Sequence, residues 1–78
     1  MDKRAMADFA ATLTTLAETN TAIASTIYLA MGSDINRYNV VKRMLLATKT
    51  AEVTSEMLTI TDKGRKIAAQ IEAVLAAS

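Results

Sequence analysis

The chain has 78 residues, with nine lysines and arginines, eight aspartates and glutamates, and neither cysteine nor histidine. A chain this short forms one domain, spanning residues 1–78, and its small core makes a homodimer a natural expectation. Without cysteine there are no disulfides or thiolate metal sites, and without histidine the usual general base and the commonest metal ligand are missing. These absences exclude most hydrolases and metalloenzymes. We therefore expect a binding protein that is not an enzyme and that needs no cofactor and no metal.

The first segment lacks the unbroken apolar run of a secretory signal, because Asp2, Asp8 and several threonines interrupt it. The longest apolar stretches are also far too short to cross a bilayer. Together with the missing cysteines, these features predict a cytoplasmic protein with no membrane partner.

Two helices are predicted in the first part of the chain. Apolar residues spaced by three and four predict a helix over residues 3–19. Asn20 and Thr21 break this pattern and offer a capping oxygen to the next element, a shorter helix over residues 22–31. Gly32 follows at the place where a glycine ends a helix in the left-handed conformation.

A third helix is predicted over residues 35–49, after a turn of only a few residues. Asp34 is a suitable N-cap for it, and apolar residues again recur at helical spacing. The predicted inward face consists of Ile35, Tyr38, Val41, Leu45 and Thr48, widened by Met44.

The period of the apolar residues then changes from about 3.6 to 2. Ala51 and Val53 alternate with polar residues, and so do Leu58 and Ile60, which predicts a small β-hairpin over residues 51–61. The threonines of this segment favour extended geometry because their branched Cβ restricts χ1.

A last helix is predicted over residues 62–76, with Thr61 as its N-cap and Asp62 placed to complement the positive end of the helix dipole. Periodicity does not distinguish an apolar face that closes the core from one that pairs with a second subunit, so both interpretations stay open. The apolar face, which in the second case is the dimer interface, contains Ile67, Ile71, Val74 and Leu75, with Ala68 beside them.

Residues 58–66, with the sequence LTITDKGRK, resemble the LTxTxKGR motif at the end of the wing in MarR-like winged-helix regulators. The resemblance covers about residues 24–71. It implies a mainly α fold with a small β-hairpin, a winged helix-turn-helix of order α-α-α-β-β-α. In that fold residues 35–49 are the recognition helix and residues 51–61 are the wing.

The resemblance also implies a role for Gly64, which would stand where a side chain crowds the neighbouring strand. The chain departs from the family pattern at two places. Thr50-Ala51 follows the recognition helix where a glycine and an apolar residue are usual, and Glu56 stands at the wing tip where a basic residue is usual.

The function implied by the resemblance is sequence-specific binding of double-stranded DNA, as in a small transcriptional regulator of phage or plasmid type. Asparagine can bond adenine through two hydrogen bonds, arginine can bond guanine or a phosphate, and lysine and hydroxyl groups can bond phosphates. The candidate DNA contacts are Asn36, Arg37, Asn39, Lys42 and Arg43 on the third helix, Thr54 and Ser55 on the wing, and Lys63 and Arg65 at the start of the last helix.

The charge distribution agrees with this interpretation in part. Between residues 32 and 66, seven basic residues stand against four acidic ones, a net charge of +3, as expected for a surface that binds a polyanion. An ordinary solvated surface is the alternative explanation. Glu52 and Glu56 in the wing act against DNA contact there, because carboxylates repel phosphates.

The alternative function is a winged-helix module or adaptor that binds protein through its first or last helix and does not bind DNA. A purely structural role is a third candidate, because a fold alone does not establish a function. For the DNA-binding function, we expect the double variant Arg37→Ala, Arg43→Ala to lose duplex binding while its melting temperature stays nearly unchanged.

Overall fold

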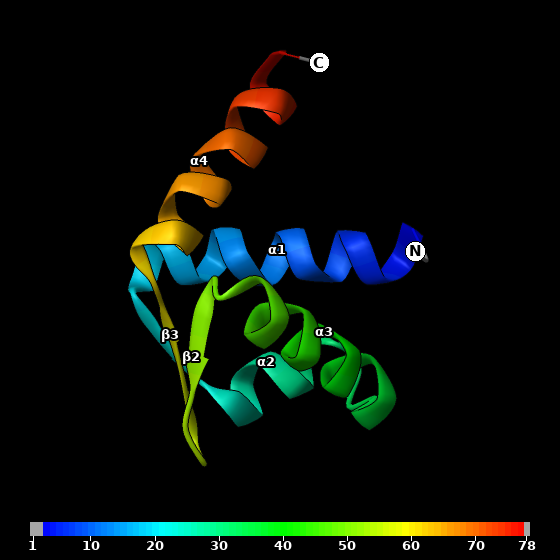
Figure 1. Cartoon of the computed structure of the whole chain (residues 1–78). Coiled ribbons are helices and arrows are strands. Elements are labelled where there is room, and N and C mark those ends of the chain that lie inside the picture. The colour runs from blue at the N-terminus through cyan, green and yellow to red at the C-terminus, as the bar shows by residue number, and fades with distance from the viewer. Residues whose placement is uncertain (1–2, 78) are drawn as a thin grey trace.

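The computed structural model describes residues 3–77 as a mainly helical fold with a small antiparallel sheet of three strands (Figure 1). The predicted helices are present, with ends within a few residues of those expected. In chain order the elements are α1 (Lys3–Thr19), β1 (Thr21–Ile23), α2 (Ala24–Ala30), α3 (Ile35–Thr48), β2 (Ala51–Val53), β3 (Met57–Ile60) and α4 (Asp62–Ala77).

Helix α1 lies across the middle of the molecule (Figure 1). The pair α2 and α3 lies on one side of it, the sheet lies at one end, and α4 rises away on the other side. Helix α1 packs against both α3 and α4. Strand β2 lies against α3, and strand β3 lies against α1. The second half of α4 therefore projects beyond the rest of the fold.

Strand β1 corrects the predicted order of elements. Residues 21–23, expected to begin the second helix, pair antiparallel with β3, so that the strand order is β1-β3-β2 and the element order is α-β-α-α-β-β-α. Asn20 has a positive φ of 67°, which turns the chain out of α1 and into the strand. Thr21 and Ile23 are β-branched and suit extended backbone. A strand of three residues is too short to show a period of its own.

Because β1 takes these residues, α2 is a helix of only seven residues. Its N-cap is Ile23, with no side-chain cap, so the predicted capping oxygen of Asn20 or Thr21 is not used. Instead the backbone N–H of Ala24 donates to the carbonyl of Glu56 at 2.8 Å. The start of α2 is thus tied to the turn of the β2–β3 hairpin.

The turn from α2 to α3 has the predicted chemistry. Gly32 has a φ of 71°, the left-handed conformation expected of it, and Ser33 follows with a φ of 57°. Asp34 caps α3, because its carboxylate accepts hydrogen bonds from the backbone N–H groups of Asn36 at 3.0 Å and Arg37 at 3.2 Å. This cap fixes where α3 begins.

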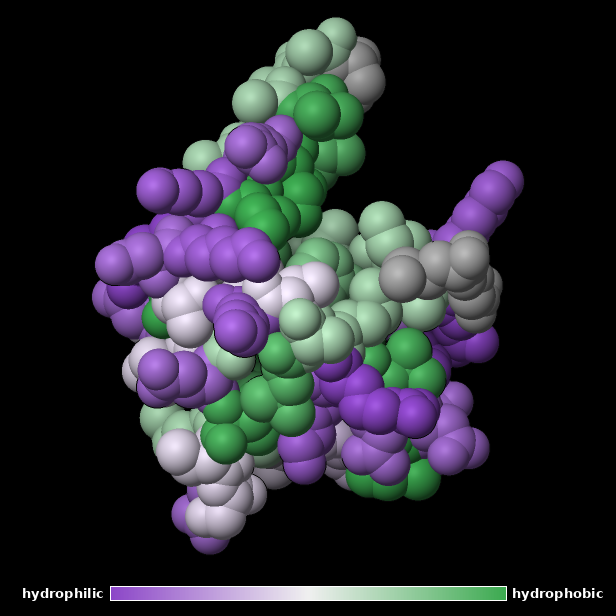
Figure 2. Space-filling model, in the orientation of Figure 1, coloured by the Kyte–Doolittle hydropathy of each residue, from purple (hydrophilic) through white to green (hydrophobic). Residues whose placement is uncertain are grey.

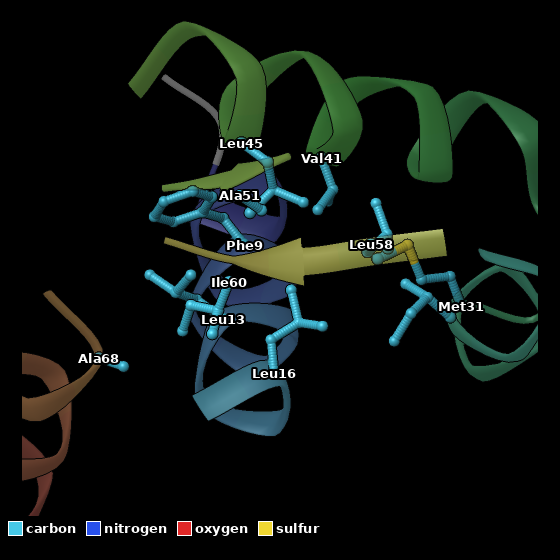
Figure 3. Close-up of a cluster of buried hydrophobic side chains, with 11 residues drawn as sticks. Phe9, Leu13, Leu16, Met31, Val41, Leu45, Ala51, Leu58, Ile60 and Ala68 are labelled. Atoms are coloured by element: carbon cyan, nitrogen blue, oxygen red, sulfur yellow. The ribbon is translucent and has the colours of Figure 1, made fainter. Parts of the chain in front are cut away.

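The core lies between α1, α3 and the central strand β3 (Figure 3). Leu13, Leu16 and Leu58 have no exposed surface and meet at its centre. Ile35 is an exception to the predicted inward face of α3, since 54% of it is exposed in the first turn, which extends past the core. The buried apolar residues are Phe9, Leu13, Leu16, Ile27, Met31, Val41, Leu45, Ala51, Leu58, Ile60 and Ala68.

The junction between β3 and α4 confirms the role inferred for Gly64 from the motif. A Cβ at this position would collide with the backbone carbonyl of Thr50 and lie 2.7 Å from Cγ1 of Ile60. Thr61 is the predicted N-cap, since its hydroxyl accepts from the Gly64 N–H at 3.0 Å and donates to the Lys49 carbonyl at 2.7 Å. The motif therefore joins α4 to the end of α3.

Candidate nucleic-acid interface

The outward face of α3 carries polar and basic side chains. Asn36, Asn39 and Arg43 are all exposed, and their spacing of three and four residues puts them on one face of the helix. Leu46 extends this row by one turn and is 46% exposed. The helix contains no acidic residue between its first and last positions. This face can therefore donate hydrogen bonds and attract an anion without an opposing carboxylate on the same helix.

Arg37 does not belong to this outward face. Its guanidinium bonds Asp8 of α1 through two hydrogen bonds, Nε to Oδ2 at 3.0 Å and Nη2 to Oδ1 at 2.7 Å. A third bond, from Nη1 to the carbonyl of Met31, is 3.1 Å long. All three directed contacts are within the chain, so the structure gives Arg37 a structural role that joins α1, α3 and the end of α2, and its contact with DNA stays a prediction.

The ion pair also changes the titration of its two groups. Hydrogen bonds from Arg37, with the positive charge of its guanidinium, hold the pKa of Asp8 below its ordinary value of 3.8, against an opposing effect of burial. The pKa of Arg37 is raised for the same reason. The pair is therefore ionised throughout the neutral range.

Lys42 lies on the side of α3 that faces the β2–β3 hairpin. It is partly buried and lines a hollow together with Thr54 and Ser55, the two hairpin residues predicted as DNA contacts. The structure thus brings together three of the predicted residues from two elements. Lys42 also borders a second, open hollow on the outward face with Asn39 and Arg43. It is therefore shared by both surfaces.

Sequence reasoning missed the contribution of α2 to the first hollow. Ser25 and Tyr28 of α2 line it, opposite Tyr38 of α3. The two tyrosine rings pack edge to face, with centroids 6.2 Å apart and an interplanar angle of 87°. Burial raises the pKa of the Tyr38 hydroxyl above its ordinary value of 10.0. No periodic signal pointed to these residues, because their proximity depends on how α2 packs against α3.

Lys63 and Arg65 lie elsewhere. Both are exposed at the start of α4, next to the end of the hairpin where Thr61 bonds the Lys49 carbonyl. The turn that contains Ser55 is at the other end of the hairpin, about 13 Å away for a four-residue strand. The predicted contacts therefore form two separate regions, one around α3 and the hairpin turn and the other at the start of α4.

The two glutamates of the hairpin are exposed and point to solvent, not into the hollow. Glu52 lies on β2 and Glu56 lies in the turn, and neither is among the residues that line the hollow beside Lys42. Glu56 directly follows Ser55, so its repulsion of an anion bound there is weakened only by its exposure to water and salt. The expected repulsion between these carboxylates and DNA phosphates applies to the outer surface of the hairpin.

The predicted dimer interface on α4 divides into two parts. Ile67 and Ile71 pack against the core, whereas Val74 and Leu75 are 69% and 66% exposed. Together with Gln70 these residues line an apolar groove along the projecting helix, visible as a hydrophobic strip above α1 (Figure 2). The first half of the face closes the core, and the second half faces solvent.

Comparison of the chain with models of known protein families, with curated proteins and with solved structures gave no match. Among residues 3–77, no helix is both long enough and apolar enough to span a bilayer.

Proposed function

We propose that this chain is a winged helix-turn-helix domain that binds double-stranded DNA in a sequence-specific manner, as a small cytoplasmic transcriptional regulator that is not an enzyme. Helix α3 is its recognition helix, and the β2–β3 hairpin is its wing. The observation that carries the proposal is the outward face of α3. It presents Asn36, Asn39 and Arg43 to solvent on a helix without a carboxylate.

These side chains suit the edges of bases in a major groove. Asn36 and Asn39 can each bond an adenine through two hydrogen bonds, and Arg43 can bond O6 and N7 of a guanine. Leu46, exposed at the end of the same row, can contact the methyl group of a thymine. Lys42, at the edge of this face, is placed to bond the phosphate backbone, which positions the protein and carries no sequence information.

We include homodimerisation in the proposal, with the exposed part of the α4 face as the interface. The face is apolar and lies on the helix that projects away from α3, so pairing there leaves both recognition helices uncovered (Figure 1). Two copies of one domain would read two half-sites of a symmetric operator about one helical turn apart, roughly 34 Å.

The α4 groove also favours a second candidate function, binding of another protein by the same fold. The two functions differ in their dependence on salt. Binding of DNA through several phosphate contacts falls steeply as salt rises, since the log of the affinity falls by about 0.9 per contact for each tenfold rise. Binding at an apolar groove is nearly independent of salt.

Selection of duplexes from a randomised pool, followed by gel shift at several salt concentrations, tests the proposal. The chain is expected to enrich a defined motif, and the variant Asn39→Ala, Arg43→Ala is expected to lose at least tenfold in affinity for it, about 1.4 kcal/mol. Lys3→Ala, which removes one charge from an exposed position on α1, is the matched control. A chain that enriches no motif and binds no duplex at low salt contradicts the proposal.

A further inference from the structure

We infer that the hollow between α2, α3 and the hairpin, here called the hairpin pocket, binds one backbone phosphate of the bound duplex. This inference rests on the proposed function and adds to it the place where the DNA backbone crosses the protein. The polar residues that line the hairpin pocket are Ser25, Tyr28, Tyr38, Lys42, Thr54 and Ser55.

The size of the pocket suits a small group. Its volume is about 260 Å³, below the range of roughly 300 to 1,000 Å³ that is typical of sites for small organic ligands. Its lining is partly apolar, through Ile35 and Val53, and otherwise carries hydroxyl groups and one ammonium group. A phosphodiester has two non-bridging oxygens that share one negative charge and accept hydrogen bonds, and two ester arms that lead away, which suits an open site with several donors.

The donors of the pocket are available to a ligand. Within residues 3–77, the side chains of Ser25, Ser55, Tyr28, Tyr38 and Lys42 take part in no hydrogen bond or ion pair, although the two tyrosine rings touch. Thr54 differs, since its hydroxyl donates to the Met57 carbonyl over a long 3.4 Å. Four residues with hydroxyl groups and one with an ammonium group thus line one hollow, and these groups have no bonded partner within residues 3–77.

The charge of the pocket selects an anion. Of the residues that line it, all within the described part of the chain, Lys42 is positive and none is acidic. Hydrogen bonds to an ionised acceptor are stronger than those between neutral groups, so a phosphate gains more here than a neutral ligand does.

The position of the pocket points to the DNA backbone as the source of this phosphate. Lys42 lines the hairpin pocket on one side and the outward hollow with Asn39 and Arg43 on the other. A strand whose bases face Asn39 and Arg43 therefore has its backbone beside Lys42. The pocket and the base-reading face are two parts of one surface, separated by a single side chain.

The test combines a protein variant with a change in the DNA. Each phosphate of the selected duplex is replaced in turn by a neutral methylphosphonate, and affinity is measured for the native chain and for Lys42→Gln. The native chain is expected to lose roughly tenfold in affinity at one position in each half-site. The Lys42→Gln variant is expected to lose little more at that position, because the contact is already removed.

Two further measurements distinguish binding of the phosphate from recognition of the bases. The Lys42→Gln and Ser25→Ala, Ser55→Ala variants are expected to weaken binding equally on all sequences, and Lys42→Gln is expected to reduce the salt slope by about one. The order of preference among sequences should not change. Lys66→Gln, which removes an exposed charge at the start of α4, is the matched control, and circular dichroism checks that each variant is folded.

The outcomes distinguish this inference from the function on which it rests. If the native chain binds its motif but no phosphate position couples to Lys42, the inference is overturned and the proposed function stands. If affinity for free inorganic phosphate matches that for the duplex, the pocket serves an unattached anion and the inference is overturned as well. If the native chain binds no duplex, both fail together.

Discussion

At the scale of single residues, the contacts of Arg37 give its side chain a structural role that the sequence did not indicate. Arg37 follows Asn36 directly in the sequence and is predicted to contact DNA with it, yet three hydrogen bonds tie it to Asp8 and to the Met31 carbonyl. Asp8 is 29 residues away in the sequence, and no local pattern pairs the two. The side chain of Arg37 remains 26% exposed and that of Asp8 13% exposed. The pair is therefore a partly screened clamp between α1 and α3.

This clamp alters the expected effect of Arg37→Ala. We expect the variant to unfold at a lower temperature than the native chain at pH 7, because Asp8 loses its partner while it stays partly buried. Arg43→Ala, on the outward face, is the control and should leave the melting temperature nearly unchanged. Thermal unfolding followed by circular dichroism measures both, and equal melting temperatures for the two variants would show that the clamp contributes nothing.

The same pair makes stability depend on pH. Because the pKa of Asp8 is lower in the folded state than its ordinary value of 3.8, folding favours the ionised carboxylate. The contribution is complete above that value and is lost as the pH falls through the lowered pKa of the folded state. The gap in melting temperature between the native chain and Arg37→Ala should therefore be constant from pH 5 to pH 8 and shrink below about pH 4. A gap that does not change in acid would contradict this assignment.

Gly64 gives a second prediction at this scale. Helix propensity alone favours Gly64→Ala by about 1 kcal/mol, but the added methyl group would collide with the Thr50 carbonyl. That carbonyl cannot move freely, since it accepts from the Thr61 N–H at 3.0 Å. We expect a net loss of roughly 1 to 3 kcal/mol in the free energy of unfolding, measured in urea. Gln70→Ala on the exposed part of α4 should change it by less than about 0.5 kcal/mol, and a stabilised Gly64→Ala would refute the steric argument.

At the scale of elements, the parts with a clear period or a clear cap could be predicted from the sequence. The stripe of α1, the Asp34 cap of α3 and the Thr61 cap of α4 each depend on neighbours within a few positions. Strand β1 could not be predicted, because its three residues become a strand through pairing with β3, between Thr21 and Thr59 and between Ile23 and Met57. The hairpin pocket could not be predicted for the same reason, since it needs α2 placed against α3.

The exposed apolar face of α4 gives a testable prediction about the proposed dimer. Val74→Glu puts a charge in the middle of the proposed dimer interface, where burying it without a partner costs several kcal/mol. We expect the native chain to sediment as a dimer and the variant as a folded monomer. Ala69→Glu puts the same charge on the same helix away from the groove and should leave the dimer intact. A native chain that sediments as a monomer at high concentration would remove α4 from the proposed interface.

At the scale of the whole molecule, the fold separates its two exposed surfaces. The outward face of α3 and the hairpin turn lie on one side of α1, and the apolar end of α4 lies on the other (Figure 1). The contacts of α1 with both α3 and α4 make it the support that holds the two apart. A partner on one surface therefore does not cover the other, as the proposed dimer on DNA requires.

The pairing of strand β3 affects which parts of the sequence can change during evolution. This strand pairs with β1, which leads into the α2–α3 segment, and with β2, which leads out of it, so the segment is held at both ends by main-chain hydrogen bonds. Main-chain bonds do not depend on side-chain identity. Residues on the exposed surface of α3 can then be exchanged over generations while the helix keeps its tilt, which under the proposed function lets a lineage acquire new target sequences on an unaltered scaffold.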